Sequence, residues 1–503
     1  MQEQIDKQKI LDSVSNSLKN FNAQVKETAI ILAAGHGKRI KSKTSKMLHK
    51  IWEKPTVERV VDACVNGLTN PNLIVVVGIK ANEVIDSLVD HKNICFAYQE
   101  IQEGTGHAVQ IGLSSIKSAD YDGNVYVLPG DMGLIDKETL SAFRNEFIES
   151  KVDMMVLTGL YEGDAEHNSY GRIVRVKDID ASGKSTAEDA GKVIEIIEHK
   201  DILSLDENKP YEVIFNKRKY SYSKKELIEN NEFNSGVYAF KYQTLKKLIS
   251  QIKSNNAQKE IYITDLISIY NQNGLTVGAI SPKDQNTLMG FNNKSVLHQM
   301  ESIARQKVYN QLKDIIEIED PEDFFIHDNV IKDILQKDKE GIVLDLSIGK
   351  GVYLGKGVKI NSNLTLKKNV FCDGNIVFGK NVTIWQNVHL STFPNQTLKI
   401  GDAVEIFWNN IIKGNMEIGE GSRIESSVNM TGSDNFPTRI GRNVTIKGTS
   451  YIFGSIIDDD IFIEHSVLIK KQVDKHIKKN GEIQKVRFYL PMPEGIDSIS
   501  ELE

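Results

Sequence analysis

An apolar run that leads into glycines and basic residues is the part of this chain best suited to chemistry. The segment 29–49 reads AIILAAGHGKRIKSKTSKMLH, and Gly35 and Gly37 would let the backbone approach a ligand closely. Backbone amides in such a loop can surround phosphate oxygens. Three cations able to bind those oxygens follow the glycines: Lys38, Arg39 and Lys46. The segment therefore predicts a site for a phosphorylated ligand.

The elements that position this loop alternate between strands and helices. After the buried strand at 29–32, strand-like runs follow at 73–78, 94–99, 124–131 and 152–160. Helix-like patterns lie at 56–66, 81–90, 107–117 and 137–149. This alternation predicts an α/β fold with a mostly parallel sheet and helices on both faces. Ligands gather at the carboxyl ends of such strands, so the loops after Ala33, Gln99 and Leu128 should converge.

Two segments precede or interrupt this alternation. In residues 1–27 the apolar side chains form one helical stripe: Ile10, Leu11, Val14, Leu18 and Phe21. We expect a helical extension that packs on the next domain rather than a targeting segment. Residues 201–232 are charged and rich in tyrosine, and they predict an inserted hairpin or lid just before the strand that carries Asn234.

From about residue 343 the apolar residues recur every six positions. One row consists of Ile348, Leu354, Ile360, Leu366, Cys372, Phe378, Ile384 and Leu390. A second row lies two residues earlier, and the period restarts at Ile400 and at Ile440. Glycine often follows the apolar residue, where we expect a tight corner. The period predicts a stacked parallel β-helix over 343–475, with loops at 391–397 and 431–437.

The length and composition are consistent with these parts. A chain of 503 residues should form two or three domains. We divide it into the extension, an α/β domain, a charged helical linker, the β-helix and a tail: 1–27, 28–300, 301–342, 343–475 and 476–503. The net charge of -6 argues against a general nucleic-acid binder or a protein of anionic membranes.

The cysteines and the hydropathy indicate a reducing compartment. The three cysteines form no CxxC pair, so neither a disulfide framework nor a cysteine zinc site is expected: Cys64, Cys95 and Cys372. The N-terminus lacks an apolar signal segment, and no run approaches the roughly 18 apolar residues that span a bilayer. We expect a cytoplasmic protein that binds neither nucleic acid nor membranes and acts on small molecules.

Eight ordered motifs connect the α/β domain to a known family. They are LAAGHGKRIKSKTSKMLH (32–49), QEIQEGTGHAV (99–109), LPGDMGLI (128–135), SYGRIVR (169–175), IIEHKD (196–201), EFNSGVYAF (232–240), EIYITDLI (260–267) and GFNNK (290–294). In this order they resemble the bacterial bifunctional N-acetylglucosamine-1-phosphate uridylyltransferase / glucosamine-1-phosphate acetyltransferase family. The resemblance implies a Rossmann-like nucleotidyltransferase domain with a mixed, mostly parallel sheet, followed by a left-handed parallel β-helix of hexapeptide repeats.

The resemblance also implies a reaction and the residues that carry it. A sugar 1-phosphate oxygen would attack the α-phosphorus of UTP in line and expel pyrophosphate, which requires alignment and charge neutralisation. Arg39 would hold the pyrophosphate and Lys46 the α-phosphate. Asp131 and Asn292 would bind Mg²⁺, which suits oxygen ligands and shares substrate phosphates.

Ten further positions match the substrate-binding residues of the family. Those expected to contact uracil or lie beside it are Gln99, Gln102, Gly104 and Thr105. Those expected to back the nucleotide are Ala33, Ala34 and Gly35. Those expected to bind the acetamido and hydroxyl groups of the sugar are Gly171, Glu198 and Asn234. A buried site of this kind rejects sugars that lack the partner group.

The chain departs from the family pattern at several of these positions. Lys38, Ile40 and Ser45 replace the usual Thr, Met and Pro of the loop, and Pro129 stands where a Tyr or related residue is usual. Lys38 adds a cation, so phosphate binding should survive. Without the usual proline the run from Ser45 should be less rigid, which could lower the rate through poorer preorganisation.

In the β-helix the resemblance is fragmentary. The family carries acetyl transfer from acetyl-CoA there, with a catalytic His on a coil of a trimer. Counting from GNMEIG (414–419) places Asn409 at that position, and Asn cannot act as a general base. The loop 429–441 resembles the acetyl-CoA loop of the family in spacing. We favour a role in homotrimer assembly and stability over acetyl transfer.

The favoured function is Mg²⁺-dependent formation of UDP-N-acetylglucosamine and pyrophosphate from UTP and N-acetylglucosamine 1-phosphate. One alternative is transfer to another sugar 1-phosphate or from another nucleotide. A second alternative, of a different class, is a weakened paralogue that serves as an assembly module. The presence of Arg39, Lys46, Asp131 and Asn292 argues against the second alternative.

Overall fold

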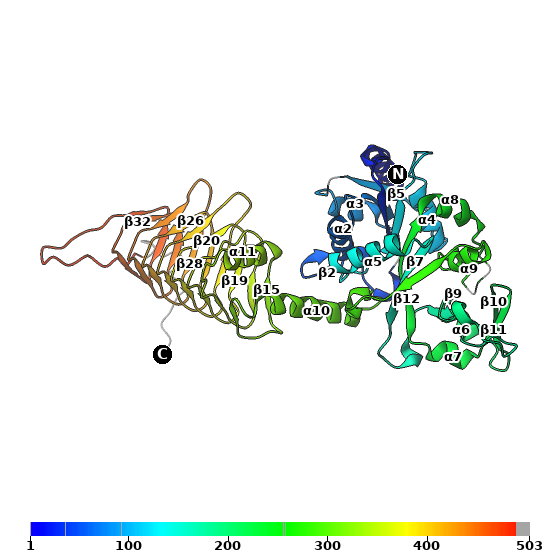
Figure 1. Ribbon diagram of the computed structural model, residues 1–503. Coiled ribbons are helices and arrows are strands. Elements are labelled where there is room, and N and C mark those ends of the chain that lie inside the picture. The colour runs from blue at the N-terminus through cyan, green and yellow to red at the C-terminus, as the bar shows by residue number, and fades with distance from the viewer. Residues whose placement is uncertain (1, 36, 92, 255, 257, 489–503) are drawn as a thin grey trace, which may run out of the picture. The chain divides into compact units, whose positions relative to one another are not determined.

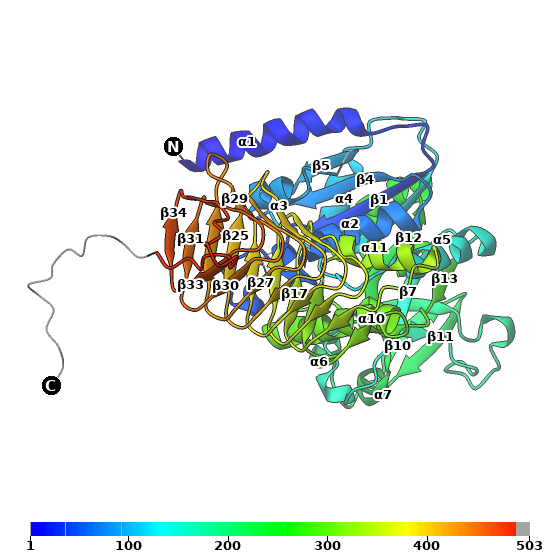
Figure 2. The same cartoon turned by 90° about the vertical axis from the view of Figure 1, so that its left-hand side faces the viewer.

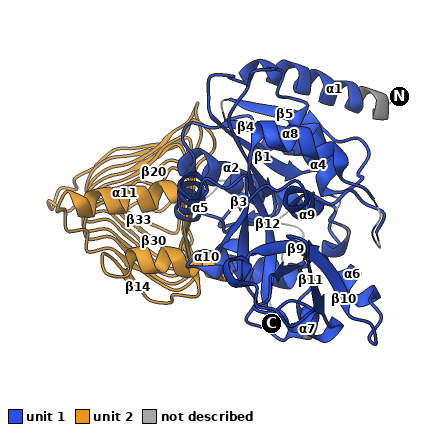
Figure 3. Ribbon diagram, turned by 45° about the vertical axis from the view of Figure 1, so that its right-hand side comes forward, with its two compact units in different colours: residues 1–301 blue, residues 302–503 orange. Residues whose placement is uncertain are grey.

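The computed structural model describes residues 2–488 except 36, 92, 255 and 257 (Figure 1). The chain forms two compact units, Met1–Glu301 and Ser302–Glu503, which are coloured separately in Figure 3. In the described part of the chain, no helix is both long and apolar enough to cross a membrane.

The first unit is built on one mixed sheet. Its main path has the order β13-β7-β12-β6-β1-β4-β5. The strands are β1 (Glu27–Ala33), β4 (Asn72–Val77), β5 (Ile94–Tyr98), β6 (Asn124–Pro129), β7 (Met154–Leu160), β12 (Glu232–Lys241) and β13 (Val277–Ile280). β1 pairs in parallel with β4 and β6, whereas β12 is antiparallel to β6 and β7. The predicted strands and the mostly parallel sheet are therefore confirmed.

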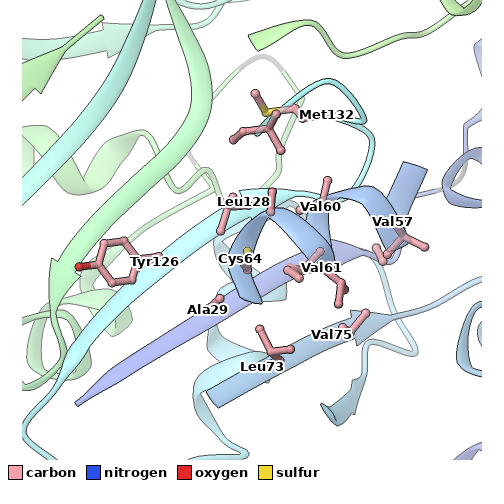
Figure 4. Close-up of a cluster of buried hydrophobic side chains, with 14 of the residues drawn as sticks. Ala29, Val57, Val60, Val61, Cys64, Leu73, Val75, Tyr126, Leu128 and Met132 are labelled. Atoms are coloured by element: carbon pink, nitrogen blue, oxygen red, sulfur yellow. The ribbon is translucent and has the colours of Figure 1, made fainter. Parts of the chain in front are cut away.

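Helices cover both faces of this sheet. They are α2 (Thr56–Gly67), α3 (Ala81–Ser87), α4 (Thr105–Leu113), α5 (Lys137–Ser150), α8 (Tyr242–Leu248) and α9 (Asp265–Gln272). Side chains alternate along β1, so Ala29 and Ile31 enter one apolar cluster and Ile30 enters the other. Figure 4 shows the first cluster, in which Val57, Val60, Val61 and Cys64 of α2 pack over the sheet. Burial of both faces explains why the central strands are almost wholly apolar.

The segment expected to be a helical extension forms α1 (Gln2–Ser17), followed by the 3-10 turn η1 (Leu18–Asn20). α1 lies along β5, the last strand of the sheet (Figure 2). Ile10 is buried in the core, and the Ser17 hydroxyl accepts a hydrogen bond from the Phe96 N–H at 2.8 Å. The Asn20 amide donates to the Ile94 carbonyl at 2.9 Å. The extension therefore satisfies backbone groups on the exposed edge of β5.

The segment 201–232 folds against two further strands, β8 (Arg172–Arg175) and β9 (Val193–Ile197). It contains the end of α6 (His199–Ser204), the antiparallel pair β10 (Tyr211–Phe215) and β11 (Arg218–Tyr222), and α7 (Lys224–Glu229). The structure thus has the hairpin that the sequence suggested, with a helix added after it.

The second unit is a parallel β-helix with three faces. The first face contains β14 (Glu317–Ile318), β16 (Ser347–Ile348), β18 (Thr365–Leu366), β21 (Thr383–Ile384), β24 (Glu405–Ile406), β27 (Arg423–Ile424), β30 (Thr445–Lys447) and β33 (Phe462–Glu464). The second contains β15 (Phe324–Ile326), β17 (Val352–Leu354), β19 (Phe371–Asp373), β22 (His389–Ser391), β25 (Ile411–Gly414), β28 (Asn429–Gly432), β31 (Tyr451–Phe453) and β34 (Val467–Ile469). The third contains β20 (Ile376–Phe378), β23 (Leu398–Ile400), β26 (Met416–Ile418), β29 (Thr438–Ile440), β32 (Ile456–Ile457) and β35 (Gln472–Val473).

The six-residue period corresponds to this stacking. Ile384, Ile406 and Ile424 are neighbours on successive strands of the first face, and each is fully buried. The two predicted loops leave the coils between β22 and β23 and between β28 and β29. The β-helix is therefore confirmed as a stack of parallel strands with an apolar interior.

Two expected boundaries differ from the structure. The expected linker 301–342 contains part of α10 (Lys294–Leu312) and α11 (Asp328–Lys339), but β14 and β15 between them already pair in parallel with β16 and β17. α11 interrupts this first coil, so the six-residue period does not reveal it. In the expected tail, the Val467 N–H donates to the Phe488 carbonyl at 2.6 Å, so the chain returns to the last coil. Residues 489–503 lie outside the described part.

Glycine and asparagine occupy the corners of the coils for different structural reasons. The glycines that follow the apolar row do not have a left-handed φ, but a Cβ on Gly419 would lie 2.5 Å from the Gly441 carbonyl oxygen of the next coil. Left-handed positions of the coils are occupied by asparagines, including Asn369 and Asn387, and by other glycines, such as Gly351. The Asn369 amide donates to Asn387 Oδ1 at 3.1 Å, so these residues stack between coils. Close stacking, not turn geometry, therefore favours glycine at Gly419.

Candidate functional site

The glycine loop after β1 packs directly on Lys46. The loop contains two 3-10 turns, η2 (Lys38–Ile40) and η3 (Lys46–Leu48). Gly37 has a φ of 58°, and a Cβ there would lie 2.8 Å from Lys46 Cβ. Only glycine fits this conformation and this spacing. The side chain of Lys38 lies outside the described part of the structure.

Lys46, Asp131 and Asn292 come together at the end of β6. The Lys46 ammonium forms an ion pair with the Asp131 carboxylate and donates a hydrogen bond to Asn292 Oδ1 at 3.0 Å. It also lies 5.4 Å from the centre of the Phe291 ring. The Lys46 and Asp131 side chains are only 11% and 16% exposed, so their attraction is weakly screened by solvent. Three residues from distant motifs therefore share one partly buried polar cluster.

The oxygen atoms of this cluster fit a hard divalent cation. Asp131 Oδ2 and Asn292 Oδ1 both contact the same Lys46 nitrogen, so a small cation could bind both of them. Among the described residues, no group of three or more His, Cys, Asp or Glu side chains is arranged to hold a metal. Mg²⁺ commonly takes one or two protein oxygens and completes its shell with water and substrate phosphates. The residues present therefore fit Mg²⁺ with a bound phosphate substrate.

A cavity of about 340 Å³ opens beside the glycine loop. Eight of the ten predicted substrate-binding residues line it: Ala34, Gly35, Gln99, Gln102, Gly104, Thr105, Glu198 and Asn234. The side chain of Ala33 instead packs in the core of the first unit and is 1% exposed. Gly171 lies immediately behind the lining residues, since a Cβ there would be 3.3 Å from Glu198 Oε1.

One end of the cavity is formed by the loop after β5. The Gln102 amide donates to the Ala34 carbonyl at 2.5 Å, and the buried Gln99 amide donates to the Gly104 carbonyl at 3.4 Å. Gly104 has a φ of 112°, and a Cβ there would lie 2.6 Å from the Ile261 carbonyl oxygen. The two glutamines are thus held in fixed positions, as recognition of a planar base edge requires.

Asn234 and Glu198 line another part of the cavity. The Asn234 N–H donates to the Gly171 carbonyl at 2.9 Å, and Asn234 Oδ1 accepts from the Gly236 N–H and the Tyr238 hydroxyl, both at 2.9 Å. Burial raises the pKa of Glu198 to about 7, with a further increase from nearby acidic side chains. This part of the cavity is therefore polar and can pair with hydroxyl or amide groups.

Arg39 occupies a different position from Lys46. It is exposed and lines a second cavity of about 560 Å³, together with Tyr161, Tyr170 and Asn292. Asn292 lines this second cavity and also bonds Lys46, so it connects the two predicted cations. The sequence placed both cations in one loop; in the structure Arg39 lines the second cavity, whereas Lys46 bonds Asn292 and does not line that cavity.

The structure adds lining residues that sequence reasoning did not assign. Glu260, Ile263 and Thr264 line the first cavity and come from the motif EIYITDLI, in which the resemblance gave no residue a role. Their position within this motif was the one sequence signal that could have identified them as lining residues. The inserted segment precedes the strand that carries Asn234, yet no residue of 201–232 lines the cavity.

The two unusual residues of the site preserve the local backbone. Ser45 has φ -55° and ψ 140°, values that proline also adopts. Pro129 lines the cavity, and a Cβ on Gly236 would lie 2.9 Å from its ring. The loop backbone at Ser45 therefore has a conformation that is compatible with the usual proline.

The position of Asn409 in the β-helix is structural. Asn409 is one of the left-handed corner residues, and its Oδ1 accepts a hydrogen bond from the Asn387 amide at 3.2 Å. His389 stacks on Phe371 with ring centres 4.6 Å apart, and burial lowers its pKa.

Comparison with known proteins supports the assignment of the first unit. The family described as "MobA-like NTP transferase domain" matches residues 29–189. The bifunctional protein GlmU of Clostridium tetani is 33% identical over 304 residues, or 60% of this chain and 58% of the relative. The GlmU of Thermoanaerobacter pseudethanolicus is 35% identical over 299 residues, or 59% and 56%. The chain thus aligns with little more than half the length of these relatives.

Solved structures show looser similarity. A UDP-glucose pyrophosphorylase complexed with UDP-glucose is 14% identical, with a TM-score of 0.39 over 56% of this chain and 100% of that one. A putative glucose-1-phosphate thymidylyltransferase from Bacillus anthracis is 17% identical, with a TM-score of 0.38 over 56% and 95%. The resemblance read from the motifs is confirmed by the sequence relatives. The first unit of this chain is a nucleotidyltransferase domain related to that of the bifunctional GlmU proteins.

Proposed function

We propose that the chain is a uridylyltransferase that forms UDP-N-acetylglucosamine and pyrophosphate from UTP and N-acetylglucosamine 1-phosphate. The observation that carries the proposal is the convergence of Lys46, Asp131 and Asn292 near a cavity lined by eight predicted substrate residues. The choice of sugar and nucleotide follows the family resemblance of the motifs, which the similarity to GlmU proteins supports.

The residues fit an in-line nucleotidyl transfer. The Lys46 ammonium neutralises charge on the α-phosphate, and the glycine loop that packs on Lys46 holds it in place. Asp131 and Asn292 would hold Mg²⁺, which supplies positive charge to the phosphates when bound. Arg39, at the second cavity, is placed to bind the leaving pyrophosphate. The two glutamines would read the base, and Glu198 and Asn234 the sugar.

Pyrophosphate release from UTP and N-acetylglucosamine 1-phosphate tests this proposal. Lys46→Met and Asp131→Asn should each lower kcat/KM by about 100-fold or more, because one preorganised charge contributes roughly 3 kcal/mol to the transition state. Lys43→Met is the matched control, since Lys43 is an exposed lysine of the same loop. Release with other sugars or nucleotides alone would select the first alternative. If no pair of nucleotide and sugar 1-phosphate releases pyrophosphate, the second alternative, a weakened paralogue that serves as an assembly module, is selected.

We further propose that the β-helix assembles a homotrimer and does not transfer acetyl groups. Support comes from an outer row of stacked rings on its second face, Phe325, Tyr353 and Phe371, with ring centres 4.7 Å apart. Ile411 and Tyr451 extend this row and are 43% and 40% exposed. Sedimentation should give three times the chain mass. Thiol release from acetyl-CoA with glucosamine 1-phosphate would contradict the second half of the proposal.

A further inference from the structure

The hairpin and helix at 211–229 lie behind the cavity, and they touch the element that carries Glu198. Glu198 immediately precedes α6, and its carbonyl accepts the first hydrogen bonds of that helix, from the Asp201 and Ile202 N–H groups at 2.9 and 3.1 Å. No residue of 211–229 lines the cavity. Any influence of this segment on the sugar must therefore be indirect, and α6 and β9 are the elements next to Glu198.

A shared apolar core joins the segment to both sides of Glu198. Ile197, directly before Glu198, and Ile202, in α6, belong to a cluster of nine buried residues. Four members of that cluster come from residues 211–229: Phe215, Tyr220, Tyr222 and Leu227. Because cores pack densely, a side chain that moves in this cluster displaces its neighbours. The backbone on either side of Glu198 is thus held by the insert.

Lys224 makes the polar part of the connection. Its ammonium donates to the Leu203 and Leu205 carbonyls, at 2.9 and 3.0 Å, at the C-terminal end of α6. A cation there satisfies carbonyls that the helix leaves without partners and interacts favourably with the helix dipole. Ser223 and Glu226 form a capping box that fixes the start of α7, so Lys224 is presented from an ordered turn.

A second polar contact reaches β9. Burial and the nearby Glu195 carboxyl raise the pKa of Tyr211, at the start of β10, so these two side chains lie close together. Glu195 lies three residues before Glu198 on the strand that leads into it. The insert therefore contacts the chain on both sides of Glu198, at Glu195 before it and at α6 after it.

We infer that the segment 211–229 is a positioning element for sugar recognition, which fixes Glu198 through Lys224 and the shared core. This inference rests on the proposed role of Glu198 as a sugar ligand. Lys224 is a positioning residue, since it contacts α6 and not the cavity. The segment supports α6 from outside the cavity. It is not the lid that its composition also allowed.

The test compares the Michaelis constants of the two substrates in the full-length chain. Lys224→Met keeps the apolar stem and removes the ammonium, so KM for the sugar phosphate should rise about three- to five-fold with KM for UTP unchanged. Lys224→Arg should restore the wild-type value, because a guanidinium can also donate to both carbonyls. Lys225→Met is the matched control: Lys225 is the next residue of α7, and its side chain is 81% exposed.

Hydrogen exchange gives a second measurement that needs no turnover. In Lys224→Met, the amides of α6 should exchange faster than in the wild type, while those of β1 keep wild-type rates. Unchanged exchange in α6, an equal rise in both Michaelis constants, or the same effect from Lys225→Met would overturn the inference. A wild-type chain that releases no pyrophosphate would instead overturn the proposed function, and the exchange result would still decide whether the insert holds α6.

Discussion

At the scale of the residue, Glu198 shows how the fold changes the chemistry of a side chain. Burial and the neighbouring Asp201 and Asp265 raise its pKa from 4.5 to about 7. Between these values the folded chain keeps a proton that the unfolded chain has lost. The free energy of unfolding therefore falls as the pH rises through this window, and the penalty is complete above pH 7.

Glu198→Gln should remove this pH-dependent penalty. Without ligands, the melting temperatures of variant and wild type should be similar at pH 4.5, and the variant should melt roughly 2–6 °C higher at pH 8. Scanning calorimetry over this range measures the difference. Glu207→Gln, at an exposed position, should show no such trend. A difference that does not change with pH would show that the Glu198 carboxyl titrates normally.

At the scale of the element, the glycine loop is shaped by its contact with Lys46. The left-handed Gly37 and its close approach to the Lys46 stem place the ammonium between Asp131 and Asn292. The spacing of glycines and lysines in the sequence suggested an anion loop. The contact itself depends on how the loop folds back across two 3-10 turns.

Comparing Gly37→Ala with a control variant should distinguish the effect of backbone strain on stability from the effect of a displaced Lys46 on activity. The added Cβ would displace Lys46, so kcat/KM should fall by about 100-fold. Gly274→Ala is the control, because Gly274 also has a left-handed φ, of 69°, but a Cβ added there would meet no heavy atom within 4 Å. Both variants should lose about 1 kcal/mol of stability, measured by urea unfolding. Equal activity in the two variants would contradict the packing argument.

At the scale of the whole molecule, the chain consists of two units with separate cores. All residues proposed to bind substrate lie in the first unit, and the second repeats one apolar coil. The coils bury Ile406 fully, whereas Ile411 on the outer face is 43% exposed. A substitution that creates a cavity inside the β-helix should thus lower the stability of the second unit without changing the reaction rate of the first.

Ile406→Ala should destabilise the second unit by about 2–5 kcal/mol, because the lost side chain leaves a cavity in a tightly packed stack. Pyrophosphate release at a temperature where the variant stays folded should remain within about two-fold of wild type. Calorimetry and the release assay measure the two effects. Ile411→Ala should change stability by less than about 1 kcal/mol. A large loss of activity in Ile406→Ala would show that the β-helix supports the site.

The sequence by itself determined the architecture and most of the candidate site. Periodicities of two, 3.6 and six residues report which side chains are buried, so they predicted the mostly parallel sheet, its helices and the β-helix. Ordered motifs predicted the lining residues, because a ligand site demands particular chemical groups at fixed places along the chain. These signals are local, and each can be read from a few neighbouring residues.

Only the tertiary structure decided what depends on contacts between distant segments. It brought Lys46 to Asp131 and Asn292, placed Arg39 at a second cavity, and buried Ala33. It also put the insert behind Glu198 and extended the β-helix to a first coil that α11 interrupts. Such contacts join residues tens to hundreds of positions apart, and their free energies depend on packing and burial that no local pattern encodes.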